Sequence, residues 1–158
     1  MILLFRPFKL GDYIETVDAS GTVREITVFY TVLATPDNKI ITVPNGGLTN
    51  SVVTNYSTES TRRVDIDIFA DYDVDTEKVK STLLAVADKC KLILDTPEKT
   101  VVILDCGDKG IKYSLRVWCE NALYWDVRFE LIEGARNAFK DSGIDIPVPQ
   151  MDVRIKKD

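Results

Sequence analysis

The sequence predicts an α+β protein in which a small all-β domain precedes an α/β domain. Short apolar segments separated by turn residues fill residues 13–55, and none of them keeps a helical period. Beyond about residue 62, two long segments repeat apolar residues every three or four positions and alternate with strand-like segments. Of the 158 residues, 45% are hydrophobic, which is sufficient for one large core or two small ones.

Four apolar segments of the first domain are candidate strands, and one of them contains a bend. They are Tyr13–Val17, Thr22–Leu33 with the bend inside it, Ile40–Pro44 and Ser51–Asn55. Glycine, asparagine and proline mark turns at residues 19–21, 35–38 and 44–47. We expect Gly46 and Gly47 to lie in a turn that opens no helix. So many short strands in so few residues predict a strongly bent sheet or a partly open barrel.

A polar run from Asn55 to Thr61 is the best candidate for the domain boundary. Beyond it, the residues of Arg63–Ala70 alternate between apolar and acidic, as in a half-buried strand. A helix is predicted from a cap at Asp75, or at Asp73, to about Lys91.

Two further strands and a second helix complete the predicted α/β domain. The strands are Thr100–Leu104 and Gly110–Cys119, and the helix spans about Ala122–Lys140, with Gly143 placed to end it. The residues predicted to share the core-facing stripes are Val79, Leu83, Val86, Cys90, Ile111, Tyr113, Leu115, Val117, Cys119, Val127, Leu131, Ala135 and Phe139. With a final strand at Ile144–Val148, the order of elements is the split βαβ arrangement of ferredoxin-like domains.

The end of the chain predicts a separate short strand at Gln150–Ile155. Pro147 and Pro149 each lack a ladder donor, so one uninterrupted central strand is disfavoured. The apolar residues of this short strand have no remaining partner within either domain. Pairing between identical chains around a rotation axis would cover the exposed edge, and a frayed tail is the alternative.

The net charge limits the possible binding partners, and the cysteine content indicates the cellular compartment. Proteins that bind nucleic acid or anionic lipid usually carry an excess of basic residues. This chain has a net charge of −5, so we expect no nucleic-acid partner. Cys90, Cys106 and Cys119 have no CxxC spacing, and their odd number does not make a disulfide framework. We interpret them as reduced, small core residues in a reducing cytoplasm.

Common catalytic and metal-binding patterns are missing from the sequence. Histidine is absent, which excludes imidazole-dependent triads and histidine-ligated zinc, and there is no glycine-rich phosphate loop. The acidic cluster Asp71–Asp75 begins like a calcium loop, but Thr76 and Thr82 replace its glycine and its bidentate glutamate. We interpret this cluster as helix capping and strand-end solvation. Asp65 and Asp67 are interpreted as the solvent face of a strand, with acid–base chemistry as the alternative. We expect no enzyme activity, no cofactor and no metal.

Aromatic residues gather near the start of the second predicted helix. They are Trp118, Tyr124 and Trp125. The surrounding charge is not basic enough for a groove that stacks nucleic-acid bases, so core packing or a subunit contact is favoured.

The apolar run at the N-terminus, Met1–Phe5, is far shorter than the roughly 20 residues that cross a bilayer. The sequence also lacks the basic leader and long apolar stretch of a secretory signal. From the sequence as written, we expect a soluble chain.

Four dispersed motifs carry a family resemblance. They are Phe5–Tyr13 (FRPFKLGDY), Val43–Gly46 (VPNG), Tyr124–Asp126 (YWD) and Pro147–Val153 (PVPQMDV). In this order they resemble the cytoplasmic part of the small-conductance mechanosensitive channel (MscS) family over essentially the whole chain. Asn38 stands where that family commonly has glycine, which is tolerable because asparagine also accepts left-handed dihedrals.

The resemblance implies a division of the chain into four regions. These are the end of a pore helix and its junction at 1–8, a Sm-like β domain at 9–61, a ferredoxin-like domain at 62–148, and a barrel strand with a tail at 149–158. The membrane-spanning helices of the family are not in this sequence. It stays open whether the chain is a piece of a channel or a natural protein without a pore.

The family's channels release ions and small osmolytes when membrane tension rises in hypo-osmotic shock. The resemblance therefore implies a vestibule that filters solutes and couples to gating, at the cytoplasmic side of a bacterial or archaeal inner membrane. The implied partners are the chain itself, as a homoheptamer, and the permeating solutes. Membrane contact is implied only through the missing helices.

Residue roles follow from the same resemblance. Phe5, Arg6, Pro7 and Phe8 match the junction of pore helix and β domain, and Asn45 and Gly46 would lie close to that junction and to a neighbouring subunit. The matching oligomerisation residues, in the stretch that forms a seven-stranded parallel barrel at the base of the family's heptamer, are Pro149, Gln150, Met151, Asp152 and Val153. The alternative functions are a soluble ring that binds RNA or a small ligand, because Sm-like folds form such rings, and an enzyme.

Overall fold

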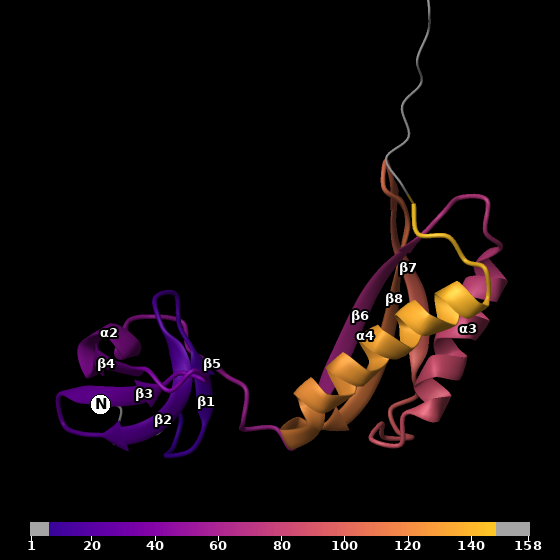
Figure 1. Ribbon diagram of the computed structural model, residues 1–158. Helices are drawn as coiled ribbons and strands as arrows, with labels where there is room; N and C mark the ends of the chain where they lie inside the picture. Colours follow the sequence, from indigo (N-terminus) through magenta and orange to yellow (C-terminus); the bar gives the residue numbers. More distant parts are fainter. Residues whose placement is uncertain (1–6, 148–158) are drawn as a thin grey trace, which may run out of the picture. The chain divides into compact units, whose positions relative to one another are not determined.

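The computed structural model describes residues 7–147, which divide into two compact units between Ser60 and Thr61 (Figure 1). Over residues 7–60 the first unit is a β domain with one short helix, and the second unit is an α/β domain. The α+β fold class predicted from the sequence is therefore confirmed.

The first unit is a five-stranded antiparallel sheet with the strand order β4-β3-β2-β1-β5. Its elements are β1 (Tyr13–Glu15), β2 (Ser20–Ile26), β3 (Tyr30–Ala34), β4 (Ile40–Pro44), α2 (Asn45–Thr49) and β5 (Thr54–Asn55). Successive strands β1 to β4 pair as neighbours, while β1 also pairs with the last strand, β5. Its core consists of Phe8, Ile14, Val23, Leu33 and Leu48.

Three local predictions for this unit need correction. The bend expected inside residues 22–33 is a hairpin turn, because β2 and β3 pair antiparallel on either side of residues 27–29. The first turn lies at residues 16–19, before the predicted one, and is closed by hydrogen bonds between Thr16 and Ala19. Gly46 and Gly47 lie inside the helix α2. A helix of five residues is too short to give a periodic apolar signal.

The turn predicted at residues 35–38 is present. The amide of Asn38 donates to the Thr35 carbonyl at 2.9 Å, and Asn38 adopts a φ of 64°. Asparagine therefore takes the left-handed conformation that the sequence predicted for this position.

The second unit has a three-stranded antiparallel sheet in the order β6-β8-β7. Its elements are β6 (Thr61–Ala70), α3 (Thr76–Lys89), β7 (Thr100–Gly107), β8 (Gly110–Glu120), a 3-10 turn (Asn121–Leu123) and α4 (Tyr124–Asp141). Figure 1 shows α4, in orange and yellow, lying along the sheet. The buried residues of both helices and of the central strand β8 form two adjoining core clusters.

The helix signals in the sequence match this unit closely. Asp75 caps α3, because its side chain accepts a hydrogen bond from the Lys78 amide at 3.2 Å. Gly143 follows the end of α4 with a φ of 61°. The buried stripes are those that the periodicity predicts, Val79, Leu83 and Val86 on α3 and Val127, Leu131, Ala135 and Phe139 on α4.

Two predictions for the second unit are wrong. Residues 144–147 do not form the final strand of a four-stranded sheet, and Val148 lies outside the described residues. A backbone hydrogen bond of 3.3 Å, from the amide of Asp71 just after β6 to the Asp145 carbonyl, joins them to the end of that strand. Cys106 is exposed, whereas Cys90 and Cys119 are buried. Its exposure arises because β7 is an edge strand with an irregularity between Ile103 and Asp105.

The sheet face opposite the helices carries paired charges. Asp67 accepts a hydrogen bond from the Ser114 hydroxyl at 2.7 Å and forms a 2.9 Å ion pair with Lys112. Asp65 is paired with Arg63 through two hydrogen bonds of 2.7 and 2.9 Å. These contacts support a structural reading of the two aspartates.

The Asp67 pairing predicts a small loss of stability at low pH. Burial raises the pKa of the Asp67 carboxyl, but Lys112 and Ser114 together outweigh this effect and hold the pKa below its ordinary value. A lowered pKa in the folded state stabilises the protein above about pH 4 and ceases to do so as the pH falls through the folded-state pKa. The ion pair is partly exposed, so we expect a contribution of at most about 1 kcal/mol.

The measurement compares the free energy of unfolding of the wild type and Asp67→Asn at pH 7 and pH 3. The variant should be less stable at pH 7, and the difference should shrink at pH 3. Asp108→Asn, at the exposed turn after β7, controls for the loss of one carboxylate. A difference that is the same at both pH values would contradict the prediction.

Candidate functional site

The predicted junction residues begin at the edge of the described chain. Phe5 and Arg6 lie outside the described residues, as do all five predicted oligomerisation residues, Pro149–Val153. Pro7 is exposed, whereas Phe8 is buried in the core of the first unit. The structure therefore describes four of the predicted site residues: Pro7, Phe8, Asn45 and Gly46.

Phe8 anchors the beginning of the described chain to the β domain. Its side chain packs in the same core as Leu48 of α2. The segment after it is closed by Asp12, whose carboxylate accepts from the Lys9 amide at 3.1 Å and from the Asn55 side chain at 2.8 Å. The Asn55 amide group also donates to the Pro7 carbonyl at 3.4 Å. A displacement of Phe8 would therefore move a packed and hydrogen-bonded unit.

Asn45 fastens the start of α2 to the β2–β3 turn. Its side-chain amide donates to the carbonyls of Thr27 at 2.8 Å and Val28 at 3.1 Å, and its Oδ1 accepts from the buried Thr31 hydroxyl at 2.8 Å. Its backbone amide donates to the Phe29 carbonyl at 2.9 Å. One side chain thus satisfies two carbonyl groups of the β2–β3 turn and the Thr31 hydroxyl of β3, which no single smaller residue can do.

The turn held by Asn45 presents two apolar side chains to solvent. Val28 is 69% exposed and Phe29 is 80% exposed. Reciprocal hydrogen bonds between Thr27 and Tyr30 close the turn behind them. Sequence reasoning missed this tip, because residues 27–30 contain no glycine, proline or asparagine and continue the pattern of a strand. The available signal was the length of Thr22–Leu33, which exceeds an ordinary strand.

Gly46 lies beside Asn45 on an open side of α2. A Cβ built on Gly46 or on Gly47 would meet no atom within 4 Å, whereas Leu48 points into the core and is buried. The helix is thus attached through Asn45 and Leu48, and its two glycines face open space. Phe8, Asn45 and Gly46, which lie far apart in sequence, belong to one packed unit.

Removal of the Asn45 side chain should destabilise the first unit. Asn45→Ala leaves the buried Thr31 hydroxyl and two carbonyl groups without this partner, so we expect a loss of about 1–3 kcal/mol in the free energy of unfolding. Urea denaturation measures it, with Asn50→Ala, an exposed asparagine just after α2, as the matched control. Equal stability of the two variants would contradict the role assigned to Asn45.

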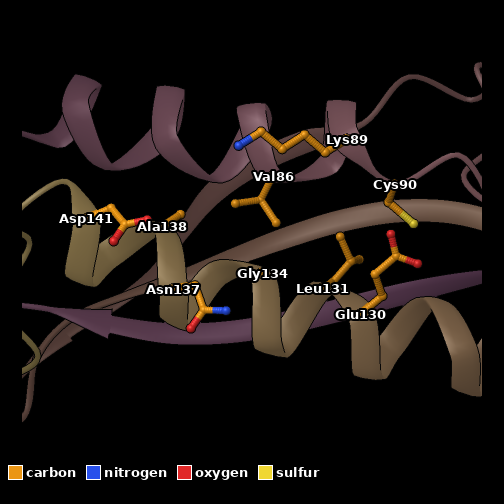
Figure 2. A pocket seen from close by; sticks show the side chains of 9 residues that line it. All are labelled: Val86, Lys89, Cys90, Glu130, Leu131, Gly134, Asn137, Ala138 and Asp141. Carbon is orange, nitrogen blue, oxygen red and sulfur yellow. The ribbon is translucent and has the colours of Figure 1, made fainter.

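A groove lies between α3 and α4 in the second unit (Figure 2). Its volume of about 200 Å³ is smaller than the roughly 300–1,000 Å³ of ordinary ligand pockets. Gly134 lies at its floor, where a Cβ would come within 2.8 Å of Val86, so the groove marks a close crossing of two helices. Burial and the neighbouring Glu130 raise the pKa of the Cys90 thiol, which disfavours the reactive thiolate. The groove is accounted for by helix packing.

Comparisons with known proteins agree on one family. Residues 1–58 match the model described as the mechanosensitive ion channel β-domain, and residues 64–146 match the model described as mechanosensitive ion channel MscS, C-terminal. In the part of the chain that the structure describes, no helix has the length and apolar character needed to span a bilayer.

Individual relatives extend the match over nearly the whole chain. A small-conductance mechanosensitive channel of Edwardsiella ictaluri is 39% identical over 155 residues, which cover 98% of this chain and 54% of the relative. The crystal structure of Helicobacter pylori MscS superposes with a TM-score of 0.91 at 30% identity, over 99% of this chain and 62% of that chain. The structure of Arabidopsis thaliana MSL1, at 17% identity and a TM-score of 0.74, shares the fold over 93% of this chain and 55% of that chain.

The chain spans about half the length of the curated relatives that it matches. Both family models fall on the two units described above, in the same order along the sequence. The resemblance carried by the FRPFKLGDY, VPNG, YWD and PVPQMDV motifs is thereby confirmed. This chain belongs to the MscS family of mechanosensitive ion channels, which is not an enzyme family.

Proposed function

We propose that this chain forms the cytoplasmic vestibule of a channel that opens under membrane tension and releases ions and small osmolytes in hypo-osmotic shock. The observation that carries the proposal is the packed and hydrogen-bonded connection from Phe8 to the start of α2. Phe8 shares a core with Leu48, and Asn45, less than one helical turn before Leu48, is bonded to the β2–β3 turn.

This connection supports a coupling role for the first unit. A pull on the residues that precede Phe8 would act on a side chain that is buried in the sheet core. Packed cores transmit displacement because their interiors are nearly incompressible. The displacement would then reach the Val28–Phe29 tip and the open surface around Gly46. If the resemblance holds for these residues, Asn45 and Gly46 would lie close to the junction and to a neighbouring subunit.

The proposal also includes the assembly of several copies of this chain and the filtering of solutes by the assembled vestibule. Self-association follows from the family's oligomeric channels, and we propose a homoheptamer in which Pro149–Val153 contribute the barrel strand. The α/β units would surround a chamber through which solutes pass on the cytoplasmic side of the membrane. The absence of a ligand-sized site in the α3–α4 groove is compatible with a wall that lets solutes pass without binding them there.

The test uses a chimera in which this chain replaces the aligned region of the Edwardsiella ictaluri channel. The chimera is expressed in bacteria that lack their own mechanosensitive channels, and survival is counted after an osmotic downshock. Survival close to that given by the unmodified Edwardsiella channel is expected. If the chimera reaches the membrane at the same level and gives no protection, the proposed function is wrong.

A further inference from the structure

Two of the three cysteines lie in one buried cluster of the second unit. Cys90 is 5% exposed and Cys119 is 0% exposed, and both belong to the core cluster that includes Val86, Leu115 and Leu131. Neither thiol has a part in the proposed function. Two thiols in one cluster can pass from a dithiol to a disulfide, so their placement decides whether they act as a pair.

The backbone brings the two cysteines together from distant parts of the sequence. Cys90 caps the C-terminus of α3, and a tight turn joins it to Ile93. Ile93 forms an isolated antiparallel bridge with Cys119, and the amide of Leu94 donates to the Trp118 carbonyl at 2.8 Å. The Cα atoms that face each other across a tight turn or across a bridge are less than about 7 Å apart. Cys90 and Cys119 are thus both neighbours of Ile93.

The two thiols differ in their access to small molecules. Cys90 lines the α3–α4 groove, and Figure 2 shows its sulfur pointing toward the Glu130 carboxylate. The groove of about 200 Å³ is too small for an ordinary ligand, but it has room for a molecule only slightly larger than water. Cys119 is not among the described residues that line the groove, and its thiol donates to the Arg62 carbonyl at 3.7 Å. A small oxidant would therefore reach Cys90 first.

We propose that Cys90 and Cys119 form a disulfide when the protein meets hydrogen peroxide, and that this bond locks the end of α3 to the end of β8. The Cys90 thiolate attacks one oxygen of the peroxide and the O–O bond breaks, which leaves a sulfenic acid on Cys90 and releases hydroxide. The hydroxide takes up the proton that the Cys90 thiol lost and becomes water. The Cys119 sulfur then attacks the Cys90 sulfur, and the expelled hydroxyl group leaves as water with the Cys119 proton. Two thiols are oxidised to one disulfide, and one peroxide is reduced to two waters.

The surroundings of the two thiols predict a slow response. Burial raises the pKa of both the Cys90 and the Cys119 thiols, and Glu130 raises that of Cys90 further. Because the thiolate is the attacking species, the pair should stay reduced in an ordinary cytoplasm and oxidise only under a sustained excess of peroxide. The exposed Cys106 should be oxidised sooner, so it is replaced by serine in every test below.

The first test exposes the folded Cys106→Ser chain to hydrogen peroxide and maps its peptides without reduction. We expect two peptides joined through Cys90 and Cys119, which a thiol reductant separates again. The urea midpoint of the oxidised chain should be higher than that of the reduced chain, because the cross-link lowers the entropy of the unfolded chain. If the joined peptides do not form in the folded chain, or form only after urea has unfolded it, the inference is wrong.

A second test separates the roles of the two cysteines with dimedone, a reagent that labels sulfenic acids. In Cys106→Ser combined with Cys119→Ser, no thiol resolves the sulfenic acid, so peroxide and dimedone should label Cys90 several times more than in Cys106→Ser alone. In Cys106→Ser combined with Cys90→Ser, the buried Cys119 should take up little label. Equal labelling of Cys90 with and without Cys119 would show that the two sulfurs do not react with each other, and would overturn the inference.

Discussion

Replacing Gly110 by valine is expected to destabilise the second unit more than any other single substitution considered for this chain. Gly110 has a φ of +89°, and a Cβ there would lie 2.6 Å from the Ala70 carbonyl oxygen and 2.5 Å from Cγ of Pro147. A strained backbone costs about 1–3 kcal/mol, and overpacking costs about 1–3 kcal/mol more. Together these equal a large part of the stability of an ordinary domain.

A second glycine separates the two causes of the expected loss, backbone strain and steric collision. Gly143 also has a positive φ, of 61°, but a Cβ there would meet no atom within 4 Å. Gly143→Val should therefore show the cost of strain alone, and Gly110→Val the cost of strain and collision. Chemical denaturation followed by circular dichroism measures both. If the two variants lose the same free energy of unfolding, the collision with Ala70 and Pro147 does not contribute to the destabilisation, and the prediction is wrong.

The second large effect is functional. In the chimera, Gly46→Asp is expected to lower downshock survival to near that of cells without a channel, because bulk and charge enter the proposed contact of the α2 start with the junction. In the isolated chain the same substitution should leave the free energy of unfolding nearly unchanged. A Cβ at Gly46 has free space, and an acidic residue in the first turn of a helix is favourable.

This contrast is what makes Gly46→Asp informative. If the variant chain folds normally but the chimera does not protect cells from downshock, the defect lies in a contact that the isolated chain does not contain. Gly46→Ala adds one methyl group without charge and serves as the control, with survival expected near that of the unsubstituted chimera. Unchanged survival of the Gly46→Asp chimera would count against any coupling role for this loop.

The parts of the fold that the sequence predicted best are those with a long periodic signal. The buried face of α4 repeats from Val127 to Phe139, and the alternation along β8 sets Tyr113 and Leu115 inward. A strong cap at Asp75 and a glycine at 143 fixed the ends of two helices. In these segments local preference and burial point to the same structure.

The misplaced elements had weak or misleading local signals. The hairpin turn at Val28–Phe29 contains none of the usual turn residues, and its shape depends on Asn45, which lies far along the sequence. A strand at 144–148 was expected from the order of elements alone, but local sequence cannot supply the ladder partner that a strand needs. The exposure of Cys106 depends on β7 being an edge, a property of topology that composition does not reveal.

For the candidate site, the sequence identified Phe8, Asn45 and Gly46 only through the family resemblance. Their chemistry alone would not have done so, because they include no titratable group and no ligand pattern. What the structure adds is the reason why an asparagine suits position 45, namely two side-chain hydrogen bonds to the β2–β3 turn and one to Thr31 of β3. It also adds the exposed Val28–Phe29 tip that those bonds hold in place.

The proposed vestibule role requires that a channel carrying this chain opens under membrane tension. Patch-clamp recording of the chimera under a ramp of membrane tension tests that claim most directly. We predict stepwise currents that appear above a threshold tension and vanish when the tension is released. If the chimera is present in the patch and tension opens no current, while the unmodified Edwardsiella channel responds under the same ramp, the account is contradicted.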